Sequence, residues 1–135
     1  MKCYVDISTK FGKGLKPGPG KAEILIWTMK DGRRRESGPY VIEVERETRQ
    51  RLAILAVNEA LKHFTRPGQE VIIRTDELYV PANVQYLEKW HRADYKTAGG
   101  RTVKNEDQWR LLWMHFQNQH IEFRIPEAEP ESVTP

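Results

Sequence analysis

The spacing of apolar residues changes near Thr48, and this change restricts the possible folds more than any other feature of the sequence. Before it, apolar and β-branched residues gather in short runs at Cys3–Ile7, Ile24–Met29 and Tyr40–Val44, which predict three β-strands. After it, apolar residues recur at the spacing of one broad helical face: Leu52, Leu55, Ala56 and Ala60, together with Ile54, Val57, Leu61 and Phe64. Strands first and helices later predict an α/β protein.

Turn and cap signals divide the chain further. Lys10–Lys21 holds four of the nine glycines and two prolines, which predicts a loop, and Asp31-Gly32 predicts a hairpin turn. Thr48 is expected to cap its helix, which Pro67-Gly68 ends. The remaining elements are predicted as a strand at Val71–Thr75, a helix from Leu78 to His91 with Pro81 in its first turn, a helix capped by Asn105 and running to about Gln119, and a strand at Ile121–Ile125. The order β-β-β-α-β-α-α-β implies a mixed five-stranded sheet with helices on its faces.

Composition excludes several classes of protein. The formal net charge of +3 over 135 residues is too small to indicate nucleic-acid binding by itself. One cysteine, Cys3, excludes an internal disulfide framework and a zinc site built from cysteines. No apolar run approaches the roughly 18 residues that cross a bilayer, and MKCYVDIS lacks the apolar core of a signal peptide. We therefore expect a cytoplasmic protein with no membrane partner.

Charge is distributed unevenly along the chain. Residues 1–35 hold nine Lys or Arg against three acids, whereas residues 121–135 hold one Arg against four Glu. The final segment, PEAEPESVTP, has no large apolar residue except Val133, so it buries too little surface to offset its ordering entropy. We expect one domain over residues 1–125 and a disordered acidic tail over residues 126–135.

Two carboxylates stand where strands are predicted, although Asp is a poor strand residue. Asp6 lies inside the first strand, and Asp76 follows the fourth. If two central strands end side by side at these residues, the pair offers hard oxygen ligands for Mg²⁺ or Mn²⁺. Two carboxylates are few for a two-metal site, so any metal binding is expected to be weak. The alternative is that each Asp caps a turn or a helix.

Four segments resemble ribonuclease H type 1, a member of the wider group with the RNase H-like fold. They run in the family's order across residues 1–125. The segments are YVDIS (Tyr4–Ser8) followed by Gly18–Gly20 and EILIW; TRQRLAILAVNEAL (Thr48–Leu61); RTDELYV (Arg74–Val80); and Trp90 with YKTA (Tyr95–Ala98) and VKNEDQW (Val103–Trp109). The resemblance implies the RNase H-like fold and the chemistry of an endoribonuclease that cleaves the RNA of RNA–DNA hybrids.

The resemblance also shows what is missing from the catalytic set. The family's site holds four carboxylates, and Asp6 and Asp76 stand at the first and third positions. The second position falls on Ala53, whose methyl group does not bind metal. The fourth belongs to a final helix for which PEAEPESVTP offers no counterpart. We therefore expect a pseudoenzyme with little or no hydrolysis, and at most weak use of Mg²⁺ or Mn²⁺.

The family's nucleic-acid contacts are better retained. Thr48 and Asn105 match residues that hold a phosphate of the DNA strand. The segment from Lys89 to Arg110 resembles the family's basic protrusion, and Trp90 adds an aromatic side chain. Its cations are expected to contact phosphates, chiefly Lys96, Arg101 and Lys104. The alternative is that these are ordinary solvated charges and that Trp90 belongs to the core.

Three hypotheses about function remain open. The first is a domain that binds an RNA–DNA hybrid or another duplex without efficient cleavage. The second is a divergent but active nuclease whose missing carboxylates come from the tail or from another chain. The third is a protein-interaction domain, in which a second copy or another protein covers the surface that the missing helix leaves exposed.

Overall fold

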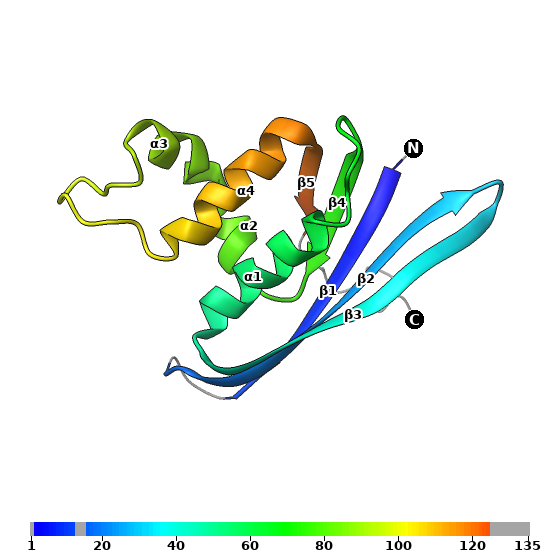
Figure 1. Cartoon of the computed structure of the whole chain (residues 1–135), viewed down its shortest axis with the longest axis horizontal. Coiled ribbons are helices and arrows are strands. Elements are labelled where there is room, and N and C mark those ends of the chain that lie inside the picture. Colours follow the sequence, from blue (N-terminus) through cyan, green and yellow to red (C-terminus); the bar gives the residue numbers. More distant parts are fainter. Residues whose placement is uncertain (1, 13–15, 125–135) are drawn as a thin grey trace, which may run out of the picture.

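The computed structural model describes residues 2–12 and 16–124, and in them a five-stranded sheet carries the helices (Figure 1). The strands are β1 (Lys2–Phe11), β2 (Gly18–Lys30), β3 (Arg33–Glu47), β4 (Glu70–Thr75) and β5 (His120–Arg124). The helices are α1 (Arg49–Leu61), α2 (Tyr79–Asn83), the 3-10 turn η1 (Val84–Tyr86), α3 (Leu87–Arg92) and α4 (Glu106–Asn118).

The sheet is mixed, as the sequence predicts. Its strand order is β3-β2-β1-β4-β5. The pairs β1–β2 and β2–β3 are antiparallel, while β4 is parallel to both β1 and β5. The three early strands form a meander, and the chain returns through helices to add the last two strands. This confirms the predicted fold class.

The core lies between one face of the sheet and the helices. Alternate residues of the strands are buried on this face, including Val5, Ile24 and Ile73. Helix α1 covers them with eight buried residues out of thirteen, and Trp109 of α4 is completely buried beside it. The opposite face carries Tyr4, Asp6, Trp27 and Arg74, which contact one another through ring stacking, hydrogen bonds and an ion pair.

Strands β1 and β2 are longer than the sequence predicts, so the loop expected at Lys10–Lys21 is shorter. The antiparallel ladder continues to Phe11↔Gly20, although residues 13–15 lie outside the described part. A Cβ added at Gly20 would lie 2.7 Å from Phe11 and 2.8 Å from Leu52. Glycine is therefore needed here for close packing, and not for a loop conformation. Pro19 sits where the register of β2 against β3 shifts, which suits a residue without an N–H.

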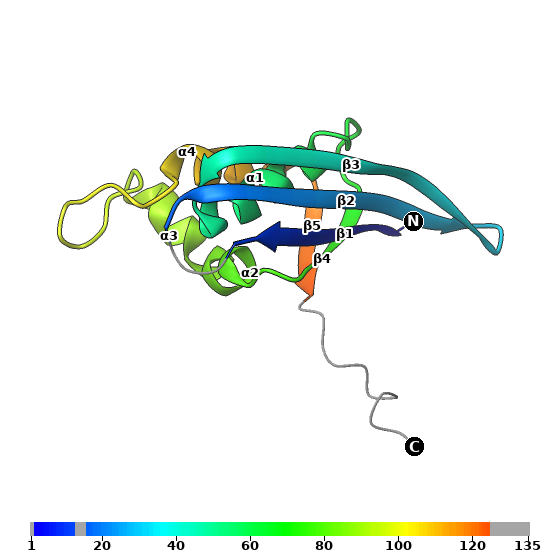
Figure 2. The ribbon, with the colours of Figure 1, turned by 90° about the horizontal axis from the view of Figure 1, so that it is seen from below.

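The hairpin turn at Asp31-Gly32 is confirmed. Both residues have positive φ, 53° and 75°, the combination of a type I′ turn. However, β3 begins at Arg33 and not at Tyr40. Its first half is polar and exposed, so it lacks the apolar pattern by which the Tyr40–Val44 part is recognised. Figure 2 shows β2 and β3 running together beyond the N-terminal end of β1.

The helical half departs from the prediction in two places. Helix α1 ends at Leu61, six residues before the expected stop at Pro67. The helix predicted from Leu78 to His91 is three short pieces, α2, η1 and α3. The Asn83 side chain donates a hydrogen bond of 2.8 Å to the Tyr79 carbonyl, and such bonds compete with helix continuation.

The ends of the fold are described only in part. β5 begins at His120 and is described as far as Arg124, and the expected acidic tail at residues 126–135 lies outside the described residues. The proposed domain boundary at residue 125 stays a prediction. Among the described helices, none combines the length and the apolar character needed to span a membrane.

Candidate nucleic-acid interface

Arg51 joins the two residues that the sequence analysis places at a phosphate. Thr48 is the N-cap of α1, and its hydroxyl accepts a hydrogen bond of 3.0 Å from the Arg51 backbone N–H. The Arg51 guanidinium donates to the Asn105 side-chain oxygen at 3.3 Å. Thr48 and Asn105 are 57 positions apart in the sequence, and this one residue contacts both.

Arg51 is itself held by acids. It donates two hydrogen bonds to the Asp107 carboxylate, at 2.9 and 2.7 Å, and lies 3.6 Å from Glu47. The bonds from Arg51 lower the pKa of Asp107 to about 2. The sequence analysis did not single out Arg51, which lies in the QR pair of the family-like segment TRQRL.

Asn105 occupies a special backbone position. Its φ is 61°, in the left-handed region, and its side chain makes no capping bond to α4, contrary to the prediction. Instead its amide donates to the Tyr79 hydroxyl at 3.1 Å, which also accepts from the indole N–H of Trp109 at 3.2 Å. Because both ends of the Asn105 amide are bonded, its side chain is fixed beside the beginning of α1.

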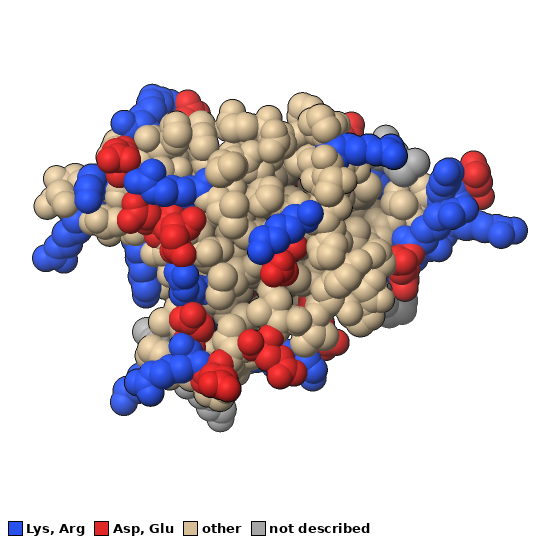
Figure 3. Space-filling view, in the orientation of Figure 1, with Lys and Arg blue, Asp and Glu red and all other residues tan. Residues whose placement is uncertain are grey.

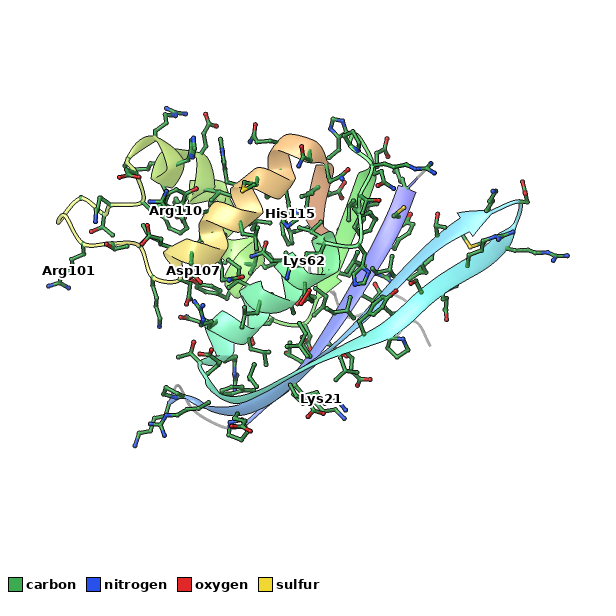
Figure 4. The ribbon with its side chains drawn as sticks, viewed as in Figure 1. Lys21, Lys62, Arg101, Asp107, Arg110 and His115 are labelled. Carbon is green, nitrogen blue, oxygen red and sulfur yellow. The ribbon has the colours of Figure 1, made fainter. Side chains whose placement is uncertain are left out.

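The basic segment lies on the loop between α3 and α4, which projects from the body of the molecule (Figure 1). Lys96 bonds the Thr102 hydroxyl at 2.9 Å across the base of the loop, and Lys104 bonds the Gln50 side-chain oxygen at 3.1 Å. Arg101 extends from the loop into solvent (Figure 4). Among the described residues, no acidic side chain forms an ion pair with any of these three cations.

Two other cations of the same segment, Arg92 and Arg110, form ion pairs with acids. Arg92 pairs with Glu88, while Arg110 pairs with Glu106 at 2.7 Å and with Asp94 at 3.0 Å. Figure 3 shows this mixture of blue and red side chains around α3 and the start of α4. The basic surface is therefore narrower than the sequence analysis implies, and we define it as Lys96, Arg101 and Lys104.

Trp90 is packed at the edge of the core. Its ring meets Trp109 edge-on, with the centroids 5.2 Å apart, and lies 5.9 Å from Tyr86. The side chain is half-buried. The structure thus gives Trp90 a packing role, which is the alternative that the sequence analysis left open, and a role in nucleic-acid contact stays a prediction.

Asp6 does not end its strand, which corrects the expectation that Asp6 and Asp76 end two strands side by side. β1 continues for five residues beyond Asp6, and Asp6 is opposite Arg74 in the ladder. The Asp6 carboxylate accepts bonds of 2.6 and 2.7 Å from Arg74 and of 2.9 Å from Trp27. Burial acts to raise the pKa of Asp6, but these hydrogen bonds outweigh it and hold the pKa below its ordinary value.

Asp76 lies farther along, at the end of β4 beside Thr9. Its backbone N–H donates to the Ile7 carbonyl at 3.3 Å. Its carboxylate accepts the Thr9 N–H at 3.1 and 3.0 Å and the Thr9 hydroxyl at 2.9 Å. Asp6 and Asp76 are therefore engaged by different groups, Asp6 by Arg74 and Trp27 and Asp76 by Thr9.

The surroundings of Asp76 do not fit a two-metal site. Ala53 of α1 is buried and brings only a methyl group. Burial raises the pKa of Glu77, and the Arg49 charge partly opposes this effect. Within residues 2–12 and 16–124, no three His, Cys, Asp or Glu side chains form a group suited to a metal ion. Phosphodiester hydrolysis by two metals requires such a clamp, so we derive no metal-dependent step.

The mixed sheet with its covering helices defines an α/β domain of the RNase H-like fold. The chain matches the crystal structure of LC9-RNase H1 with a TM-score of 0.75 over 96% of its residues and 64% of that chain, at 19% identity. It also matches LC11-RNase H1, crystallised with an RNA/DNA hybrid, with a TM-score of 0.60 over 96% of its residues and 89% of that chain, at 17% identity.

Sequence comparison gives the family. The RNase H family matches residues 1–128, and the chain belongs to that family. It is 33% identical to the ribonuclease H of Xanthomonas euvesicatoria over 90% of this chain and 77% of that protein. It is 39% identical to the ribonuclease H of Nitrosospira multiformis over 56% of this chain, but the match spans only 49% of that relative.

Proposed function

We propose that the domain binds an RNA–DNA hybrid or a related duplex through its phosphates and has little or no hydrolytic activity. The observation that carries the proposal is the link from Thr48 through Arg51 to Asn105. Backbone and side-chain donors fixed at a helix N-terminus are suited to a phosphate, and the basic surface adds charge beside them. The hybrid bound to LC11-RNase H1 supports the same choice of ligand.

Weak hydrolysis follows from the chemistry around Asp76. One carboxylate with its oxygens bonded to Thr9, a buried methyl group at Ala53 and a nearby Arg49 guanidinium do not form a clamp for two cations. Mg²⁺ or Mn²⁺ is therefore proposed to bind weakly at most. The proposed role of Asp6 as a metal ligand is weakened further, since Arg74 occupies both of its oxygens.

The test combines binding and cleavage on one labelled hybrid. Binding by fluorescence anisotropy in low salt should give a saturable curve, and Asn105→Ala should weaken it about tenfold. Cleavage in Mn²⁺ at high protein concentration should be absent. Absence of binding at low salt, where phosphate contacts are strongest, would contradict the proposal.

The same cleavage assay distinguishes a divergent active nuclease from a binding domain without activity. Cleavage that disappears in Asp76→Asn would mean that the site is completed by residues outside the described part or by a second chain. Cleavage that persists unchanged in Asp76→Asn would identify a contaminating nuclease, because no proposed arrangement of this site works without Asp76.

A second copy or another protein as a partner also stays a prediction. One apolar groove of about 600 Å³ opens between η1, α3, α4 and β5. Its lining includes Val84, Trp113, Phe116, Ile121 and Phe123. Light scattering over a range of concentrations measures the oligomeric state, and a strict monomer would count against self-association.

A further inference from the structure

The end of the β2–β3 hairpin is a second strongly basic surface. We call residues Lys30–Arg35 the hairpin tip. Four of its six residues are cationic and exposed, and Asp31 is its one acid. Figure 3 shows blue side chains gathered at the end of the molecule that this hairpin occupies in Figure 1.

The β2–β3 ladder continues without a register shift to the turn at the tip. Lys30 pairs directly with Arg33, and the type I′ turn at Asp31-Gly32 joins them. Arg34 lies 4.0 Å over the Trp27 ring and forms an ion pair of 2.7 Å with Glu36. Trp27 in turn stacks on Tyr4 of β1, with ring centroids 4.2 Å apart. Arg34 therefore anchors the hairpin to the sheet and is not itself free to bind a ligand.

The other three cations point away from this anchor. Side chains alternate along a strand, so Lys30, Arg33 and Arg35 leave the hairpin on the face opposite Arg34. Among the described residues, none forms a hydrogen bond or an ion pair with these three side chains. Lys30 and Arg33 are like charges directly opposite in the ladder, an arrangement that destabilises a sheet. An anionic ligand would relieve the repulsion within this unpaired cluster.

The chemistry of the tip favours phosphates over a protein surface. A protein interface needs an apolar centre and roughly 1,000 Å² of contact, whereas the exposed large apolar side chain at the tip is Met29 alone. Two of the three cations are arginines, whose planar guanidinium matches the geometry of a phosphate. We propose that the hairpin tip is a second phosphate-contacting surface for the nucleic acid, an inference that rests on the proposed function and extends it.

The tip lies far from the candidate interface. Thr9, which holds Asp76, pairs with Ala22 of β2, and eight further residues lead to Lys30. At a strand rise of about 3.3 Å, the tip is about 26 Å from this Thr9–Asp76 contact, or roughly eight nucleotide steps of 3.4 Å. The loop that carries the basic surface lies at the opposite end of the molecule from the tip (Figure 1). A short duplex at the interface does not reach the tip, whereas a longer nucleic acid contacts both.

The test compares two hybrid lengths, about 8 and about 24 base pairs, in fluorescence anisotropy. The triple variant Lys30→Gln, Arg33→Gln, Arg35→Gln should bind the short hybrid as the wild type does and the long hybrid about tenfold more weakly. The slope of log affinity against log salt on the long hybrid should become about 3 units less steep, because three phosphate contacts are lost.

The matched control removes the same charge elsewhere. The variant Lys62→Gln, Arg66→Gln, Arg124→Gln changes three exposed cations outside both surfaces. An equal loss of affinity for the long hybrid in this control, or no loss of affinity in the tip variant, would overturn the inference. Equal loss on both hybrids would also overturn it, since the tip would then not be a separate surface. Circular dichroism confirms that each variant is folded.

Two further outcomes identify the source of failure. If the wild type binds neither hybrid, the proposed function itself is wrong and the inference fails with it. If the wild type prefers an acidic peptide such as poly-glutamate and the tip variant loses that preference, the tip is a protein-binding surface and the inference is overturned while the proposed function remains.

Discussion

At the scale of single residues, Arg51 is the side chain on which the candidate interface depends. It contacts Thr48, Asn105 and Asp107 at once. We expect Arg51→Gln to weaken hybrid binding about tenfold, because hydrogen bonds to charged groups contribute about 1.5–3 kcal/mol and Asn105 loses its orientation. Anisotropy at constant salt measures the change. Arg124→Gln removes another ion-paired arginine, which is more exposed than Arg51, and should leave affinity unchanged. If Arg51→Gln also leaves affinity unchanged, Arg51 is not part of the interface.

The contact between Arg51 and Asp107 predicts that the stability of the fold depends on pH. The pKa of Asp107 is about 2 in the fold against 3.8 ordinarily, so the folded state favours its charged form. The stabilisation is complete above about pH 4 and is lost as the pH falls toward 2. Asp107→Asn should therefore lower the melting temperature at pH 6 by more than at pH 2.5. A difference in melting temperature between variant and wild type that stays constant from pH 6 to pH 2.5 would contradict the lowered pKa of Asp107.

At the scale of elements, Gly20 shows how closely the strand meander packs against α1. A methyl group there meets Phe11 and Leu52 at under 3 Å. We expect Gly20→Ala to lower the free energy of unfolding by about 1–3 kcal/mol through overpacking. Urea denaturation gives the value. Gly18→Ala is the matched control two residues earlier in β2, where an added Cβ meets no atom within 4 Å, so similar losses in both variants would mean that packing is not the cause.

Burial explains which elements the sequence predicts and which it does not. Apolar spacing located all five strands and α1 because their buried residues form the core, with Val5, Ile24 and Leu52 as examples. It missed the first half of β3, which is exposed and held by backbone pairing with β2. The apolar pattern also predicted one helix over Leu78–His91. The hydrogen bond from the Asn83 side chain cannot be recognised from hydropathy.

In the candidate site too, the sequence indicates some residues and not others. The family pattern located Thr48, Asn105 and Asp76, but their partners come from distant segments. Arg51 and Asp107 are 56 positions apart, and Thr9 and Asp76 are 67 apart. The Arg74 bonds to Asp6 depend on the register of β1 against β4, which places the two residues directly opposite each other. Strand register of this kind is set by tertiary pairing, so local motifs did not reveal that Asp6 is occupied.

At the scale of the whole molecule, two basic surfaces lie at opposite ends of a chain whose net charge is only +3 (Figure 1). Affinity for a polyanion depends on such local clusters more than on net charge. Lys96, Arg101 and Lys104 form one cluster, and three cations of the hairpin tip form the other. At about 0.9 per phosphate contact, the slope of log affinity against log salt should be about −2.7 on a short hybrid with three contacts and about −5.4 on a long one with six.

The same charge distribution predicts binding that does not require divalent metal. The described residues offer phosphate contacts through fixed cations and lack a group of three metal-ligating side chains. Hybrid affinity in EDTA should therefore equal the affinity in Mg²⁺ at matched ionic strength, within about twofold. The comparison needs equal ionic strength because Mg²⁺ also screens phosphates. The contradicting result is an affinity that requires Mg²⁺ and falls in Asp76→Asn. It would mean that a metal ion bound at Asp76 bridges the protein and a phosphate. The active nuclease would then be the better hypothesis.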